Sequence, residues 1–318
     1  MLGNEHKYVG VAAAAALIIL ALTRCAGLAA SGAAPTGTAR APILLTDGLG
    51  RQVQLAAPAQ RVVSLAPSNT EILFAIGAGS QVVGRDEFSD FPAEANSIQS
   101  VGGSMGEYST ETILALQPDL VLAAEINPPE LVRALEGLGL RVYYLSNPVM
   151  LEGMYANLEN VGQLTGRGSE AAALIRSLRG RVSAVDEKIS TVSDKPVVFY
   201  EIDATDPGKP YTYGPGTFGD QLIQRAGGLN VAGNLEDAYP QVSLEQIVVA
   251  RPEVILLGDA QFGTTIQSVQ ARAGWDQLPA VLNGRIHPFD DNLVSRPGPR
   301  LVDGLEQLAR LLHPELFR

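Results

Sequence analysis

Cysteine and histidine are scarce in this chain of 318 residues. The single cysteine, Cys25, excludes an intrachain disulfide framework and a metal site built from several thiolates. The three histidines are His6, His287 and His313, and none lies at metal-ligand spacing from another. The sequence therefore predicts no structural zinc site.

Blocks of like charge are also missing. The formal net charge is -11, and the basic residues form no cluster, so a nucleic acid is not an expected partner. The chain contains no phosphate-loop lysine motif and no Gly-x-Ser-x-Gly elbow, and its few histidines offer no nucleophile–base pair. An extracytoplasmic hydrolase that works through Asp and Glu alone stays open as an alternative of another class.

One glycine run has the spacing of a dinucleotide-binding loop. It covers residues 214–219, and Glu236 follows about 20 residues later. The preceding strand is expected to end near Ile202, so a long loop separates it from the glycines, and Glu236 falls in a loop. A dinucleotide site needs the glycines directly after the strand, so we do not predict one here.

The N-terminal segment has the features of an export signal. Lys7 precedes residues 9–22, a run without charge that is long for a signal peptide and short for a membrane span. Residues 22–25 then resemble a bacterial lipoprotein signal, in which the cysteine, here Cys25, is lipidated. Arg24 departs from that pattern, because the residue before the cysteine is normally small.

Two alternatives to lipidation at Cys25 stay open: cleavage after Ala29 or Ala34, and retention as an uncleaved anchor. All of them place the folded part outside the cytoplasm. We predict a signal or anchor segment over residues 1–24 and a flexible spacer over 25–42, rich in Ala, Gly, Ser, Thr and Pro.

After the spacer, apolar strands alternate with helices. A hairpin is predicted around residues 47–50, and a helix is expected to begin at Pro67 with Glu71 in its first turn. The other predicted strands are 61–65, 82–84, 120–123, 142–145, 197–200, 254–257 and 285–288, and the other predicted helices are 129–138, 220–226 and 300–312. Strands that are apolar throughout indicate parallel sheets covered on both faces, in an α/β fold.

A longer helical pattern covers residues 169–190. Apolar side chains recur there at helical spacing, at Leu174, Leu178, Val182, Val185 and Ile189. A helix of that length spans about 30 Å, the width of a small domain. We expect it to bridge two lobes, and a coiled-coil partner is the alternative. The predicted domains are an N-terminal lobe over 43–165, a bridging helix over 166–192 and a C-terminal lobe over 193–318.

The most specific feature is an internal repeat. Residues 109–122 and 243–256 both read Ser-x-Glu-x-Ile, then a proline, an acidic residue and an apolar strand, at identical spacing. Each serine is expected to cap a helix, and each helix must end before its proline. A looser match relates residues 71–84 to 220–233. Two copies of one α/β unit predict two similar lobes with a cleft between them.

The glutamates of this repeat are Glu111 and Glu245. Either one alone is an ordinary first-turn residue, favoured there by the helix dipole. Their occurrence at the same position of both lobes indicates a two-pronged docking surface, because carboxylates pair well with arginines of a partner.

Residues 61–71, Arg-Val-Val-Ser-Leu-Ala-Pro-Ser-Asn-Thr-Glu, resemble the opening of periplasmic cobalamin- and iron-chelate-binding proteins of ABC importers. Residues 88–92, the Glu111 segment, 227–231 and 239–245 continue the match in register. The resemblance covers the chain after the spacer. It implies two Rossmann-like lobes bridged by a rigid helix, a monomer whose lobes move little on binding, and no catalytic activity. It also implies that Glu111 and Glu245 engage arginines of the membrane permease.

The same resemblance implies a metal chelate in the cleft, held by aromatic faces and a few polar anchors. The positions it indicates are Pro67, Ser68, Phe88, Tyr213, Phe218, Tyr239 and Arg296. Arg296 would meet a carboxylate or phosphate of the ligand, or would lie on the surface. Cobalamin-binding members carry a tryptophan where this chain has residues 103–106, Gly-Ser-Met-Gly. That replacement removes one stacking surface and leaves haem, a ferric siderophore or a smaller corrinoid as alternatives. The resemblance as a whole implies a corrinoid of the cobalamin type as the expected ligand.

Overall fold

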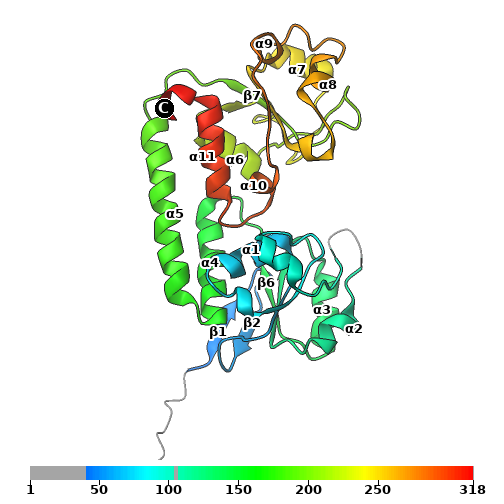
Figure 1. Ribbon diagram of the computed structural model, residues 1–318, viewed down its shortest axis with the longest axis vertical. Coiled ribbons are helices and arrows are strands. Elements are labelled where there is room, and N and C mark those ends of the chain that lie inside the picture. The colour runs from blue at the N-terminus through cyan, green and yellow to red at the C-terminus, as the bar shows by residue number, and fades with distance from the viewer. Residues whose placement is uncertain (1–40, 104–106, 318) are drawn as a thin grey trace, which may run out of the picture. The chain divides into compact units, whose positions relative to one another are not determined.

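The computed structural model describes residues 41–103 and 107–317 (Figure 1). The signal segment and Cys25 lie outside the described residues, as do Ser104, Met105 and Gly106 of the loop that replaces the tryptophan. Within the described ranges, no helix combines the length and apolarity that crossing a membrane requires.

The N-terminal sheet has the strand order β4-β3-β5-β6, and all of its neighbouring pairs are parallel. Its strands are β3 (Val62–Ser64), β4 (Val82–Arg85), β5 (Leu120–Ala124) and β6 (Val142–Leu145). An antiparallel hairpin precedes it, formed by β1 (Ile43–Thr46) and β2 (Gln52–Leu55), as the sequence predicts.

The C-terminal sheet repeats this order as β8-β7-β9-β10, again all parallel. Its strands are β7 (Val197–Glu201), β8 (Leu229–Asn230), β9 (Val254–Leu257) and β10 (Ile286–Pro288). In each sheet the chain runs from the first strand (β3 or β7) through a helix to an edge strand (β4 or β8). It then passes through the Ser-x-Glu helix to the strand on the opposite side of the first one (β5 or β9). The predicted α/β fold with two similar, parallel-stranded lobes is confirmed.

Most helices follow the sequence prediction, but it did not include the 15-residue helix at Leu151–Thr165 or the three short helices between residues 266 and 295. In the N-terminal lobe they are α1 (Pro67–Ala75), α2 (Thr110–Ala115), α3 (Pro129–Gly137) and α4 (Leu151–Thr165). The long helix is α5 (Gly168–Ile189). The C-terminal lobe adds α6 (Phe218–Arg225), α7 (Leu244–Ala250), α8 (Ile266–Gln270), α9 (Pro279–Leu282), α10 (Asn292–Ser295) and α11 (Leu301–Leu312).

Each sheet is buried on both faces, because successive residues of a strand enter different cores. In β5, Leu120 and Leu122 belong to a core shared with α4, α5 and α11, whereas Val121 packs on the opposite face against α2 and α3. The second sheet alternates in the same way between the shared core and one formed with α7, α8 and α9. This period of two is the geometry of the pleat, and it explains why the strands are apolar throughout.

The apolar stripe of α5 is used within this chain. Leu178, Val182 and Val185 are buried in the shared core, where α5 packs on α4 and on α11 (Figure 1). Arg181 of α5 also forms ion pairs with Asp303 and Glu306 of α11. The stripe therefore needs no coiled-coil partner, and the helix bridges the N-terminal lobe and the closing helix.

Candidate ligand-binding site

The carboxyl ends of the N-terminal strands line a cavity of about 370 Å³. Parallel strands place these ends on one edge of the sheet, which is where α/β folds bind ligands. Ala66 to Asn69 follow β3, Ala124 to Ile126 end β5, and Leu145 to Asn147 end β6. The C-terminal lobe closes the cavity with Ser295, Arg296 and Pro297.

A second cavity of about 240 Å³ lies at the corresponding edge of the C-terminal sheet. Ile202 follows β7, and the loop before α6 adds Tyr213, Gly216 and Thr217. Asn147 and Ser295 line both cavities. The two spaces therefore adjoin, and together they form a cleft to which both lobes contribute.

The structure brings all seven sequence-predicted ligand residues to the walls of this cleft. The larger cavity takes Pro67, Ser68, Phe88 and Arg296, and the smaller one takes Tyr213, Phe218 and Tyr239. Their contact with a ligand stays a prediction.

The aromatic residues divide into exposed and buried rings. Phe88 is 50% exposed and Tyr239 is 57% exposed, so both present open faces. Tyr213 and Phe218 are 4% and 7% exposed and belong to the core. The ring of Tyr213 supports that of Tyr239, with 6.0 Å between the centroids and 59° between the planes.

An aspartate that the sequence analysis did not single out holds the floor of the smaller cavity. Asp291 Oδ1 accepts hydrogen bonds from the hydroxyls of Tyr213, at 2.8 Å, and Tyr200, at 3.0 Å. Burial raises the pKa of Asp291, and hydrogen bonds from Tyr213, Ser295 and Tyr200 only partly oppose this. Burial and the charge of Asp291 together raise the pKa of Tyr213 well above its ordinary value. The signal that could have found Asp291 is its place three residues after the last predicted strand.

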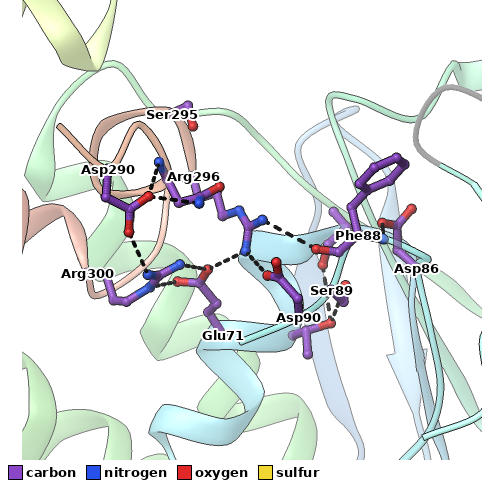
Figure 2. A network of polar contacts seen from close by, with 12 residues as sticks. Glu71, Asp86, Phe88, Ser89, Asp90, Asp290, Ser295, Arg296 and Arg300 are labelled. Carbon is purple, nitrogen blue, oxygen red and sulfur yellow. Dashed lines mark hydrogen bonds and ion pairs between the residues drawn. The ribbon is translucent and has the colours of Figure 1, made fainter. Parts of the chain in front are cut away.

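A second unforeseen feature joins the two lobes, and Figure 2 shows it. Arg300 donates two hydrogen bonds to Glu71, at 2.6 and 2.9 Å. Arg296 Nη1 donates to Glu71 Oε1 at 3.2 Å and to Asp90 Oδ1 at 2.7 Å. We call Glu71, Asp90, Arg296 and Arg300 the inter-lobe clasp. In Figure 2 the ring of Phe88 points away from it.

The clasp shows that the predicted place of Glu71 in a first helical turn is wrong, and that Arg296 does not lie on the surface. Glu71 does not lie in the first turn of α1, which contains no acidic residue; it lies a turn further along, with a side chain 1% exposed. It therefore balances arginines of the other lobe and does not interact with the helix dipole. Arg296, whose side chain is 13% exposed, is not a surface arginine, and protein carboxylates already compensate its charge.

The serines of the repeat cap their helices, as predicted. Ser109 Oγ accepts from the backbone N–H of Thr112 at 3.1 Å, and Ser243 Oγ accepts from that of Gln246 at 3.3 Å. The glutamates Glu111 and Glu245 follow in the first turns of α2 and α7 and are exposed. Neither lines the cleft. In Figure 1, α2 and α7 both lie on the side opposite α5.

The glycine run at residues 214–219 serves loop packing. A Cβ at Gly214 would lie 2.0 Å from the carbonyl oxygen of Asp237, and one at Gly219 would lie 2.2 Å from the ring of Tyr213. Thr217, inside the run, caps α6. Among the described residues, no group of three or more His, Cys, Asp and Glu side chains is placed to hold a metal ion.

Comparison with known proteins gives one family. The family model described as "Periplasmic binding protein" matches residues 62–293. An ABC transporter substrate-binding lipoprotein of Bacillus subtilis, YvrC, is 30% identical over 282 residues, covering 87% of each chain. The vitamin B12-binding protein of Vibrio parahaemolyticus is 32% identical over 258 residues, covering 79% of this chain and 89% of its own.

A solved structure with a different named ligand is also similar. The periplasmic heme-binding protein RhuT from Roseiflexus sp. RS-1, in apo form, superposes with a TM-score of 0.73 at 27% identity. The match covers 81% of this chain and 99% of that one. The family and these relatives are substrate-binding proteins and not enzymes, so the hydrolase alternative is set aside. Duplicated parallel sheets, a bridging helix, a cleft between lobes and a family match over most of the chain lead to one conclusion: the chain belongs to the periplasmic binding protein family.

Proposed function

We propose that this chain captures a corrinoid of the cobalamin type outside the cytoplasm and delivers it to an ABC importer. The observation that carries the proposal is the cleft of two adjoining cavities, into which Phe88 and Tyr239 present half-exposed rings. A flat macrocycle gains most from such aromatic faces. The vitamin B12-binding relative at 32% identity adds support. Haem and ferric siderophores are the alternatives, and the similarity to a heme-binding structure supports the first.

Calorimetry on the purified chain tests this ligand. We expect cyanocobalamin to bind in a one-to-one complex. Phe88→Ala and Tyr239→Ala should each weaken binding about five- to tenfold, the range that loss of one aromatic contact gives. Phe262→Ala is the matched control, because Phe262 is 83% exposed and lines neither cavity. Binding of haem or a ferric siderophore, without heat from any corrinoid, would transfer the role to that ligand.

We propose further that Glu111 and Glu245 dock the loaded protein on arginines of the permease. Both carboxylates are exposed at the start of equivalent helices, and an exposed apolar residue follows each by three positions, Leu114 and Val248. Residues three apart share one face of a helix. Each lobe thus presents a carboxylate beside an apolar contact, which is a suitable combination for an interface.

The docking proposal is tested by transport. Glu111→Ala combined with Glu245→Ala should abolish uptake of the ligand while its affinity is unchanged. Glu130→Ala combined with Glu170→Ala is the matched control, since these are exposed first-turn glutamates of α3 and α5. Loss of ligand affinity in the first pair would assign these carboxylates to the binding cleft. The chain is expected to act as a monomer, which sedimentation checks.

Membrane attachment through Cys25 completes the proposed role. The lipoprotein-like signal before Cys25 and the stretch rich in Ala, Gly, Ser, Thr and Pro after it support attachment. Mass spectrometry of the mature N-terminus should find a lipidated Cys25. An unmodified terminus after Ala29 or Ala34, or an intact leader, would identify one of the other forms.

A further inference from the structure

Few charged groups line the cleft walls, and acidic residues outnumber basic ones. Apart from tyrosines, the titratable residues lining the two cavities are Glu125, Asp291 and Arg296. Any selection among chelates by these groups rests on the proposed function of this cleft as a ligand site.

The positive charge on the wall is already balanced. Arg296 is held by Glu71 and by Asp90 within the inter-lobe clasp. Arg300, its neighbour in the clasp, lines neither cavity. Among the described residues, therefore, no uncompensated cation faces the space where a ligand would lie.

Glu125 is different, because its negative charge is unbalanced. It follows β5 directly, its side chain is exposed, and it makes no hydrogen bond or ion pair within the described parts of the chain. The charge of Glu125 also acts on Tyr239 of the other lobe. The pKa of Tyr239 is raised mainly by burial and, next, by the negative charge of Glu125. The exposed ring of Tyr239 and the free carboxylate of Glu125 thus face the same ligand space.

Neutral hydrogen-bonding groups complete the wall. Asn147 and Ser146 are exposed after β6, and Asn147 lines both cavities. An amide offers both a donor and an acceptor. It therefore suits amide, hydroxyl or hydroxamate groups on the periphery of a chelate.

We infer that Glu125 is a specificity-determining residue, which makes the cleft select metal chelates with a neutral or cationic periphery over those that carry carboxylates. An anionic group placed near Glu125 meets a like charge that no cation of the described chain compensates. Near a protein surface this repulsion is large enough to change affinity by about tenfold for each ligand charge. The effect weakens as salt concentration rises.

The test uses pairs of ligands that differ in charge and hardly in shape. One pair is cyanocobalamin and its monocarboxylic acid, in which one peripheral amide has been hydrolysed. The other pair is haemin dimethyl ester and haemin. Binding of each to the full chain is measured by calorimetry at low and high salt, for the wild type, Glu125→Gln and Glu187→Gln. Glu187 is the control, because it is an exposed acid of α5 that lines neither cavity.

In the wild type, cyanocobalamin should bind about tenfold more tightly than its monocarboxylic acid, which carries one added charge. Haemin dimethyl ester should bind about tenfold to a hundredfold more tightly than haemin, which carries two carboxylates. Glu125→Gln should remove this difference in affinity, because the carboxylate member should bind more tightly while the affinity of the other member is unchanged. Glu187→Gln should leave the difference in affinity as it is in the wild type. Equal binding of both members, or a gap that persists in Glu125→Gln, would overturn the charge selection while the binding function stands. Failure of all four ligands to bind would overturn the corrinoid and haem forms of the proposed function, and the charge selection with them.

Discussion

Within the inter-lobe clasp, one carboxylate of the N-terminal lobe faces two guanidinium groups of the C-terminal lobe. Glu71 is 1% exposed, and its partners Arg296 and Arg300 are each 13% exposed. Phe91 adds its ring to the same contact, with the guanidinium carbon of Arg300 4.0 Å from the ring centroid. A buried carboxylate is tolerated here because each of its oxygens is hydrogen-bonded.

Glu71→Gln should therefore destabilise the protein by about 3 kcal/mol, within the range for breaking a buried ion pair on one side. The loss arises because two arginines keep their burial and lose the charge that compensates it. Urea denaturation measures the effect. The exposed neighbour Asp90, changed to Asn, should cost under about 1 kcal/mol, as surface ion pairs do. Equal costs for both changes would contradict the assignment of Glu71 as the centre of the clasp.

Asp291 gives a prediction about pH. Burial raises the pKa of this carboxyl in the folded state above its value in the unfolded chain. The folded state then binds this proton more tightly, so the associated stability is fully present below the unfolded pKa of about 3.9 and is lost as pH rises through the folded pKa. The urea midpoint of the wild type, relative to that of Asp291→Asn, should therefore be highest in acid. This advantage should shrink as the pH rises toward neutral. A constant difference would contradict the raised pKa.

Single residues also mark the limit of what the sequence predicts. Four of the seven cleft positions were predicted from motifs that match a family in register: Pro67, Ser68, Phe88 and Tyr239. Tyr213 and Phe218 were predicted because they flank the glycine run, and Arg296 because of its charge. The ion pairs of the clasp were not predicted, because Glu71 and Arg300 are 229 positions apart and no pattern in the sequence relates them. Glu125 sits at a strand end, which places it at the cleft. Only the structure shows that its charge is left without a partner.

At the scale of elements, periodicity predicted most of the fold. Apolar runs of four or five residues gave the strands, because both faces of each sheet are covered. The repeat of Leu178, Val182 and Val185 gave α5, because these residues fill one stripe of the shared core. Short pieces such as α8 and α9 carry too few turns for a period to emerge, so they were missed. The lobe boundaries at 165 and 193 stay predictions.

Two helical glycines offer a matched test of packing. Gly180 lies inside α5, and a Cβ added there would meet nothing within 4 Å. Gly180→Ala should stabilise the protein by about 0.5–1 kcal/mol, because alanine loses less backbone entropy on folding. In α4, a Cβ at Gly162 would lie 2.6 Å from Cβ of Ala171. Gly162→Ala should therefore destabilise the α4–α5 contact by about 1–3 kcal/mol. Thermal unfolding checks both, and the same sign for both would contradict the packing described.

At the scale of the whole molecule, α5 and the clasp are two separate constraints on the lobes. A continuous helix resists hinge motion more than a loop does, and the clasp adds contacts across the cleft. We expect ligand binding to change the distance between the lobes by less than about 2 Å, as in pre-organised complexes.

Spin labels test this expectation in a Cys25→Ser background, at Glu130→Cys in α3 and Glu236→Cys in the C-terminal lobe, both exposed sites. The distance distribution should be narrow without ligand and nearly unchanged with it. Adding Glu71→Gln should broaden it. A large shift on binding in the unaltered clasp would show that the lobes close on the ligand.

The C-terminal segment from Asp291 to α11 has a consequence for biogenesis. It supplies a wall of the cleft at Ser295, the arginines of the clasp at Arg296 and Arg300, and the helix that packs on α5. Synthesis proceeds from the N-terminus, so this segment emerges after both sheets and α5. A partly exported chain would carry both sheets and still lack one wall of the cleft and both arginines of the clasp. Under the proposed function, the protein captures its ligand only once residues 291–312 have joined the rest of the fold.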